Sequence, residues 1–371
     1  MLQAGKNITA KDIFTEQSEQ HNYPCFGGNG IRGYVTNSNR NGEFPIIGRQ
    51  GALCGNINLA IGEFYATEHA VVVERFSDTD LMWAYYTLIE LNLNQYATAT
   101  AQPGIAVNVI NDVPIPVPPL KEQCRISKVV KLLFSLVDNI EQRKIDIQAT
   151  IKQGKSKILD LAIHGKLVPQ DPTDEPASEL LKRINPKAEI ACDNPQYKKL
   201  PNGWCRCTLK DIGIFESGYA FSSDEYKQNG VPLVRISNIT NNGNIDLSSC
   251  VYIQNYNNSK FIIHEGDLLI AMSGATTGKM GVYKYKTDAL LNQRVGNLKC
   301  TEAWLQQYRN YFMLAKSNYI LNIAYGGAQP NISAKAILSI KIDLPPLNEQ
   351  HRIVAKIEEL FAQLDNIASS L

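Results

Sequence analysis

The sequence has almost no excess of charge of either sign. It carries 37 Lys and Arg against 36 Asp and Glu, a formal net charge of +1 over 371 residues. Bulk charge therefore indicates no particular partner, and any nucleic-acid surface would have to be a local patch. No apolar run approaches the roughly 18 residues that a membrane helix needs, and residues 1–6 lack the apolar segment of a signal peptide. We expect no membrane partner.

Cysteine and histidine are too scattered to predict a disulfide framework or a metal site. Of the eight Cys, only Cys205 and Cys207 are close together, and they lack the two-residue gap of zinc and redox motifs. The five His have no ligand spacing. Reduced thiols in a cytoplasmic protein are the simpler interpretation. We expect no metal and no cofactor.

Catalytic motifs are also missing. The glycines of Phe26–Gly33 lack the strand–turn–helix context of a dinucleotide site, and Gly274–Lys279 is too short between its glycines for a phosphate loop. The Asn/Asp-Pro-Pro-Tyr/Phe motif of aminomethyltransferases does not occur. The sequence therefore favours a protein that is not an enzyme, and an enzyme with an unfamiliar site is the weakest alternative.

One stretch of the chain occurs twice. Pro118–Ile126, with the sequence PPLKEQCRI, returns 227 residues later as Pro345–Ile353, with the sequence PPLNEQHRI. The match continues without a gap to Asp138–Ile140 against Asp365–Ile367. A repeat of this kind indicates two similar halves, each ending in an apolar helix introduced by prolines.

The repeated stretch opens two predicted helices, a long central one and a short C-terminal one. Their apolar residues alternate in steps of four and three, as in the seam of a coiled coil. The predicted helix-pairing residues are Ile126, Val130, Leu133, Val137 and Ile140 in the first copy, and Ile353, Ile357, Leu360, Leu364 and Ile367 in the second. Pro119 predicts a sharp start and Gly165 the end of the long helix. We expect the helices to pair antiparallel, which relates the halves by a pseudo-twofold axis.

The remaining chain predicts an α+β fold with two similar mixed α/β domains. Short β-branched runs separated by glycine turns indicate strands, and Leu81–Leu88 has helical spacing with Asp78 or Asp80 as a candidate N-cap. The first domain has no counterpart of Leu200–Trp204, so its opening segment is expected to be missing. The predicted divisions are 1–119 for the first domain, 120–165 for the long spacer helix, 166–199 for a proline-rich linker with one short helix, 200–347 for the second domain and 348–371 for the short C-terminal spacer helix.

Two similar domains on paired helices suit a double-stranded polymer of matching symmetry. A helix of this length spans about 65 Å at ~1.5 Å per residue, and one turn of DNA is about 34–36 Å. The architecture therefore predicts a protein that reads two short DNA sequences separated by unread base pairs.

Several motifs resemble those of the specificity subunit of type I restriction–modification systems. They are Leu344–Ile353, Leu161–Gln170 together with Asp174–Ala177, and Leu200–Trp204, and the resemblance covers nearly the whole chain. It implies two target-recognition domains that each read one half of a bipartite site. It further implies helices that set the spacing and dock two methyltransferase (modification) subunits, restriction subunits that join through these, and no catalysis in this subunit.

The candidate DNA-binding residues are polar side chains near glycine turns. Arg, Lys, Asn, Gln, Ser and Thr suit base edges, and phosphates are bound by cations and backbone N–H groups. The candidates are Arg32, Arg49, Gln50 and Asn56 in the first domain, and Arg235, Ser273, Thr276, Thr277, Lys279, Gln293 and Arg294 in the second. For each alone, ordinary surface hydrogen bonding is the simpler interpretation. The equal spacing of Gly51 and Gly55 and of Gly274 and Gly278 favours DNA contact for the set. The alternative function is a coiled-coil scaffold that binds no DNA.

Overall fold

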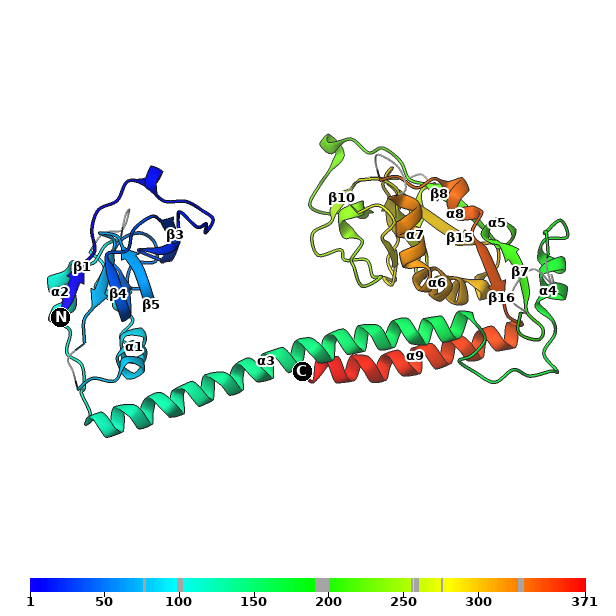
Figure 1. The fold of residues 1–371 in the computed structure, drawn as a ribbon. Coiled ribbons are helices and arrows are strands. Elements are labelled where there is room, and N and C mark those ends of the chain that lie inside the picture. The colour runs from blue at the N-terminus through cyan, green and yellow to red at the C-terminus, as the bar shows by residue number, and fades with distance from the viewer. Residues whose placement is uncertain are drawn as a thin grey trace. The chain divides into compact units, whose positions relative to one another are not determined.

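The computed structural model describes residues 1–75, 78–98, 103–190, 200–254, 256, 260–274, 276–325 and 330–371. It consists of two compact units, Met1–Arg143 and Lys144–Leu371, and each contains both helices and strands (Figure 1). The predicted α+β class is confirmed.

The first unit is built on a six-stranded sheet with the order β1-β6-β4-β5-β2-β3. Its strands are β1 (Leu2–Ala4), β2 (Tyr23–Gly27), β3 (Gly30–Val35), β4 (Arg40–Gly48), β5 (Ile57–Ala66) and β6 (Ala70–Val73). β2 runs parallel to β5, whereas the other pairs are antiparallel. Phe26, Ile46 and Phe64 belong to one buried apolar cluster. Apolar residues at alternating strand positions thus form this core.

Three helices accompany this sheet: α1 (Leu81–Glu90), α2 (Val107–Asn111) and the first part of α3 (Leu120–Ile163). Asp80 is the N-cap of α1, because its Oδ1 accepts a 2.9 Å hydrogen bond from Trp83 N. The same carboxylate accepts from Ser127 Oγ of α3, and Gln123 Oε1 of α3 accepts from the Asp80 N–H at 2.9 Å. This cap therefore also attaches α1 to α3.

Helix α3 ends at the predicted glycine. Gly165 has a φ of 64°, and the Lys166 N–H donates to Leu161 O at 2.9 Å. A residue in the left-handed conformation just after the helix lets the next backbone N–H donate back to a carbonyl of the last turn, which would otherwise lack a partner.

The described residues of the second unit form two four-stranded sheets and one two-stranded sheet, with the orders β10-β9-β14-β11, β13-β12-β15-β8 and β16-β7. Its strands are β7 (Cys205–Thr208), β8 (Gly213–Ser217), β9 (Val231–Val234), β10 (Val251–Ile253), β11 (Ile262–Ile263), β12 (Leu268–Ala271), β13 (Met280–Val282), β14 (Ala289–Leu291), β15 (Val295–Cys300) and β16 (Lys341–Leu344). Its helices, besides the end of α3, are α4 (Ala177–Ile184), α5 (Leu209–Ile212), α6 (Gln306–Ala315), α7 (Ser317–Ala324), α8 (Ala334–Leu338) and α9 (Leu347–Ser369). One large core joins Leu159 and Ile163 of α3 to Ile353 and Ile357 of α9.

Helix α9 lies antiparallel along the C-terminal part of α3 (Figure 1). Lys144 Nζ donates to Leu371 O at 2.7 Å, and Lys155 Nζ lies 2.5 Å from Asp365 Oδ1. The chain's last residue thus lies beside Lys144, and the start of α9 lies at the C-terminal end of α3 (Figure 1).

This register corrects part of the predicted pairing. α9 meets residues 144–163 of α3 and not the seam of the first copy. Of that seam, Ile126, Leu133, Val137 and Ile140 are 37–67% exposed and Val130 is half-buried. In the second copy Ile353 and Ile357 are buried, Leu360 and Leu364 half-buried and Ile367 exposed. The reason is that the two helices are antiparallel. α9 starts at the C-terminal end of α3, and its 23 residues extend along only about the last half of the 44 residues of α3.

Candidate nucleic-acid interface

Each unit contains the same glycine turn after a sheet strand. In the first unit, the Gly55 N–H donates to Gly48 O at 2.6 Å, and in the second the Gly278 N–H donates to Ala271 O at 2.8 Å. Gly51 and Gly274, which occupy equivalent places in the two turns, have φ values of 94° and 88°. This left-handed conformation is accessible to glycine without steric cost, so the matching glycine spacing reflects a matching backbone path.

Two further segments join the turn in the same way in both units. The Ile105 N–H donates to Arg49 O at 2.9 Å, and the Ile332 N–H donates to Met272 O at 3.1 Å. On the other side, the Arg49 N–H donates to His69 O at 3.0 Å and the Met272 N–H to Arg294 O at 2.9 Å. Each unit therefore assembles one loop cluster from three segments. Gln102 and Gln329, which precede the third segment, lie outside the described residues.

The paired turns show which positions can face a ligand. Gln50, Leu53 and Asn56 of the first turn are exposed, and their equivalents Ser273, Thr276 and Lys279 are half-buried. Cys54 and Thr277 occupy the position before the second glycine and are buried in both units.

Thr277 was predicted to bind DNA, and this prediction is wrong. Its side chain is completely buried, and its Oγ1 donates to Gly274 O at 2.6 Å and to Pro330 O at 3.2 Å. The hydroxyl therefore fastens the turn to the neighbouring segment. A spacing of residues cannot reveal this, because the inward direction follows from the path of the turn.

In the first unit the predicted residues surround an open hollow of about 590 Å³. Arg32 of β3 and Gln50 line it, together with Asn29 and His69. Asn56 Nδ2 donates to Asn29 Oδ1 at 2.9 Å, which brings a third predicted residue to its edge. Donors and acceptors from three segments thus converge on one concave surface, as a site for base edges or phosphates requires.

Several polar atoms around the loop clusters are buried without a hydrogen-bond partner in the described part of the chain. They include Nε of Arg49, Nδ1 of His69, Nε of Arg235 and Oγ1 of Thr276. Buried polar groups in native proteins are almost always paired, so unpaired ones need an explanation. Other unpaired atoms lie elsewhere, for example on Arg309 and Asn310, but those at the loops are placed where a bound ligand or water could satisfy them.

The other predicted residues of the second unit lie around its cluster. Gln293 and Arg294 are exposed between β14 and β15. The Arg235 guanidinium lies 5.7 Å from the centre of the Tyr226 ring. A Cβ built on Gly274 would lie 3.3 Å from Ile236 Cδ1, so the residue after Arg235 adjoins the turn.

Sequence reasoning missed several residues of these clusters. His69 occupies the place of Arg294, and Asn29 links the β2–β3 turn to Asn56. Tyr219, which is 50% exposed, forms a parallel β-bridge with Asn292 beside the second cluster. Lys6 forms the same kind of bridge with Thr67 beside the first cluster. Tyr219 could have been found from the sequence, because Gly5-Lys6 near the start of the first unit matches Gly218-Tyr219 near the start of the second.

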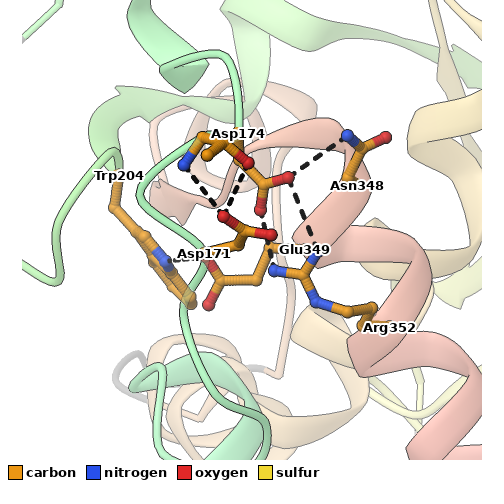
Figure 2. A network of polar contacts seen from close by, with 7 residues as sticks. Asp171, Asp174, Trp204, Asn348, Glu349 and Arg352 are labelled. Atoms are coloured by element: carbon orange, nitrogen blue, oxygen red, sulfur yellow. Dashed lines mark hydrogen bonds and ion pairs between the residues drawn. The ribbon is translucent and has the colours of Figure 1, made fainter.

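The repeated joint of the second unit is held by a network of polar contacts around the buried Glu349 and Asp174 side chains (Figure 2). Trp204 Nε1 donates to Glu349 Oε2 at 3.0 Å. Arg352 forms a 2.7 Å ion pair with Asp174, and Asn348 Nδ2 donates to Asp174 Oδ1 at 3.2 Å. Burial raises the pKa of Glu349 above its ordinary value, and the Trp204 N–H and the Arg352 charge partly oppose this. The linker, the domain opening and α9 thus meet at one point.

The joint of the first unit shares part of this design. Gln123 Nε2 donates to Pro118 O at 2.8 Å, and Gln350 Nε2 donates to Pro345 O at 2.9 Å. Each glutamine thus folds back over its own Pro-Pro step and satisfies a carbonyl that precedes the helix. The repeated sequence therefore encodes a repeated turn into the helix.

The described residues contain no group of three or more His, Cys, Asp and Glu placed to hold a metal ion. Within the same ranges, no helix has the length and apolar character needed to span a membrane. No disulfide joins two of the seven described cysteines, and Cys192 lies outside the described residues.

Comparison with known sequences identifies related proteins. The family model of the type I restriction modification DNA specificity domain matches residues 3–149 and 201–370. The specificity subunit of the Escherichia coli type I restriction enzyme EcoprrI is 45% identical over 141 residues, which cover 38% of this chain and 35% of that protein. The EcoAI specificity subunit of Escherichia coli is 31% identical over 319 residues, which cover 67% of this chain and 53% of that protein. The chain thus spans about a third to a half of these relatives.

Solved structures agree at the level of the fold. A chain of a type I R-M system, solved to explain its complex assembly and conformational transition, matches with a TM-score of 0.66 and 16% identity over 99% of this chain and 89% of its own. The HsdS subunit from Thermoanaerobacter tengcongensis matches with a TM-score of 0.54 and 16% identity over 94% of this chain and 85% of its own. Since the family model covers both units, the chain belongs to the family of type I restriction modification DNA specificity domains.

Proposed function

We propose that the chain is the DNA sequence-recognition subunit of a type I restriction–modification enzyme. Each unit reads one half of a bipartite double-stranded target, and the base pairs between the halves are not read. The chain carries no catalytic step in this role. Two methyltransferase subunits dock on the helices, and restriction subunits join through them.

The observation that carries the proposal is the duplicated loop cluster. Two glycine turns with the same hydrogen bonds present Gln50 and Asn56 in one unit and Ser273 and Lys279 in the other. The side chains differ while the backbone is kept, which is what two readers of different half-sites require. Arg32, Arg49, Arg235, Thr276, Gln293 and Arg294 complete the proposed contacts, and Thr277 is not among them.

A coiled-coil scaffold without DNA is the alternative, and the exposed apolar seam of α3 favours it. Methylome sequencing of a strain with and without this gene separates the two functions. Under the proposal, one gapped adenine-methylation motif disappears with the gene and returns with a plasmid copy. An unchanged methylome, with partners still bound to the helices, would favour the scaffold.

A further inference from the structure

Two large aliphatic side chains are exposed inside the hollow of the first unit. Ile31 of β3 and Leu53 of the glycine turn are each 55% exposed, and both line the hollow. Their two segments are in close backbone contact, because a Cβ built on Gly28 would lie 2.5 Å from Gln50 O. At the place of Leu53 the second turn has Thr276, a smaller polar residue that is half-buried. The repeated turn itself therefore does not require an exposed aliphatic residue at this position.

The surroundings of this aliphatic pair are polar and carry positive charge. Arg32, which follows Ile31, and Gln50 are exposed, and the lining also includes Asn29 and His69. No Asp or Glu is among the described residues that line the hollow. An anionic ligand with hydrogen-bonding groups suits such a surface. The two aliphatic side chains require in addition that this ligand carry an apolar group.

The hairpin of β2 and β3 presents these groups at the edge of the sheet. β3 is the last strand in the sheet order, and Gly27 pairs with Gly30, so Gly28 and Asn29 alone form the turn between the strands. The major groove of DNA admits a two-stranded ribbon of this kind. Base edges in that groove present donors, acceptors and one apolar substituent, the C5 methyl group of thymine. DNA therefore combines the anionic backbone, the polar edges and the apolar group that this hollow fits.

We propose that Ile31 and Leu53 read a thymine in the half-site of the first unit by packing against its C5 methyl group. Gln50 lies on the same turn as Leu53, and its carboxamide suits the N6 and N7 atoms of an adenine. The inference rests on the proposed function. It adds which base this half-site contains and assigns two residues without hydrogen-bonding side chains as specificity-determining.

Deoxyuridine tests the methyl group directly, because it keeps the hydrogen-bonding edges of thymine and lacks only the C5 methyl group. Each thymine of the target motif is replaced in turn, and the affinity of the assembled complex for each duplex is measured by fluorescence anisotropy. With the parent chain we expect at least one replacement to weaken binding by about fourfold, the effect of withdrawing one methyl group from an apolar contact.

The variant Ile31→Asn/Leu53→Asn links that loss to the aliphatic pair. It should bind the thymine and deoxyuridine duplexes equally at the affected positions, all of which should lie in one half-site. Replacements in the other half-site should act as they do with the parent chain. Neither residue belongs to a buried apolar cluster of the first unit, so the melting temperature of the variant should stay close to that of the parent.

The matched control is Ile61→Asn. Ile61 of β5 is 63% exposed and does not line the hollow, so this variant should keep the preference for thymine. A second control, Ile31→Val/Leu53→Met, retains apolar side chains and should also keep it.

Three outcomes would contradict the inference in different ways. A thymine preference that is absent from the parent, or that persists in the double Asn variant, would overturn it while a gapped methylation motif still supports the proposed function. A methylome that does not depend on the gene would overturn both. If sedimentation shows that the double Asn variant no longer binds the methyltransferase subunits, the aliphatic pair is a protein contact and the inference is wrong.

Discussion

At the scale of single residues, the two glycine turns separate an accessible side chain from a buried one. By type and spacing, Thr277 and Lys279 are equally good candidates for DNA contact. The structure buries Thr277 and leaves Lys279 partly accessible, because the turn places the position before its second glycine inward in both units. Residue types drew attention to these loops, but which of their side chains are accessible depends on the backbone path, which is set by contacts with segments far along the chain.

Arg49 offers the sharpest test of base reading. Its Nε is unpaired within the described residues, so we expect Arg49→Ala to alter recognition of one half-site only, at a cost of about 1–3 kcal/mol if it reads a base. The measurement is fluorescence anisotropy of the assembled complex on DNA with each half-site varied. Arg40→Ala is the control: its Nε is likewise unpaired within the described residues, but its guanidinium donates to Gln3 Oε1 at 2.9 Å within the sheet, away from the turn. A loss that is equal for unrelated DNA sequences would make Arg49 a phosphate contact.

Glu349 predicts how stability depends on pH. Its folded-state pKa is raised, chiefly by burial, so the folded chain binds this proton more tightly than the unfolded chain does. Its contribution to the free energy of unfolding therefore falls as pH rises through the ordinary glutamate range and the raised pKa. Glu349→Gln keeps an acceptor for Trp204 Nε1 and should remove this fall, so that variant and parent diverge as pH increases.

The matched control is Glu122→Gln, which changes the repeat-equivalent and exposed residue. Urea unfolding from pH 4 to pH 7 measures both variants against the parent. A constant difference between Glu349→Gln and the parent at every pH would mean that the carboxyl group does not titrate differently in the folded chain.

At the scale of elements, the sequence predicted the ends of helices better than their partners. Pro119 and Gly165 act within a turn of where they stand, so local chemistry places the start and stop of α3. Which part of α3 meets α9 depends instead on direction and length. The short helix starts beside Ile163 and therefore covers the later part, and the periodic seam alone could not decide between the two parts because both are apolar.

Two glycines test the C-terminal part of α3 in opposite directions, Gly154 within the helix and Gly165 just beyond its end. Gly154 lies within the helix, and a Cβ there would lie 3.7 Å from Leu364 Cδ1, an ordinary contact. Gly154→Ala should therefore raise the free energy of unfolding by roughly 0.5–1 kcal/mol. Gly165→Ala should lower it by about 1–2 kcal/mol, because its φ is 64° and a Cβ would lie 2.6 Å from Pro201 Cγ. Urea titrations measure both. A destabilising Gly154→Ala would indicate that α9 packs more closely on α3 than this contact implies.

At the scale of the whole molecule, the duplication could be detected in the sequence because it preserves residues where the helices begin and where the glycine turns occur. The repeat at Pro118 and Pro345 and the paired glycines identified both units. It did not reveal that the second unit divides its strands among three sheets, since strand partners depend on long-range pairing. The two units keep separate buried clusters, around Phe64 in the first and around Ile270 and Ile353 in the second. The loops of one unit can therefore change in sequence without disturbing the core of the other.

Separate cores predict separate unfolding, because cooperativity follows shared buried contacts and multidomain chains depart from two-state behaviour. Scanning calorimetry of the full chain should resolve two transitions. Phe64→Ala, at a fully buried position, should lower the unfolding free energy of the first unit by about 3–5 kcal/mol and move its transition to lower temperature. Ile270→Ala, equally buried, should lower the unfolding free energy of the second unit by about 2–5 kcal/mol. The double variant should lower both additively, since distant sites without shared partners behave independently. If either single variant moved both transitions together, α3 would couple the two cores and the halves would not be independent readers.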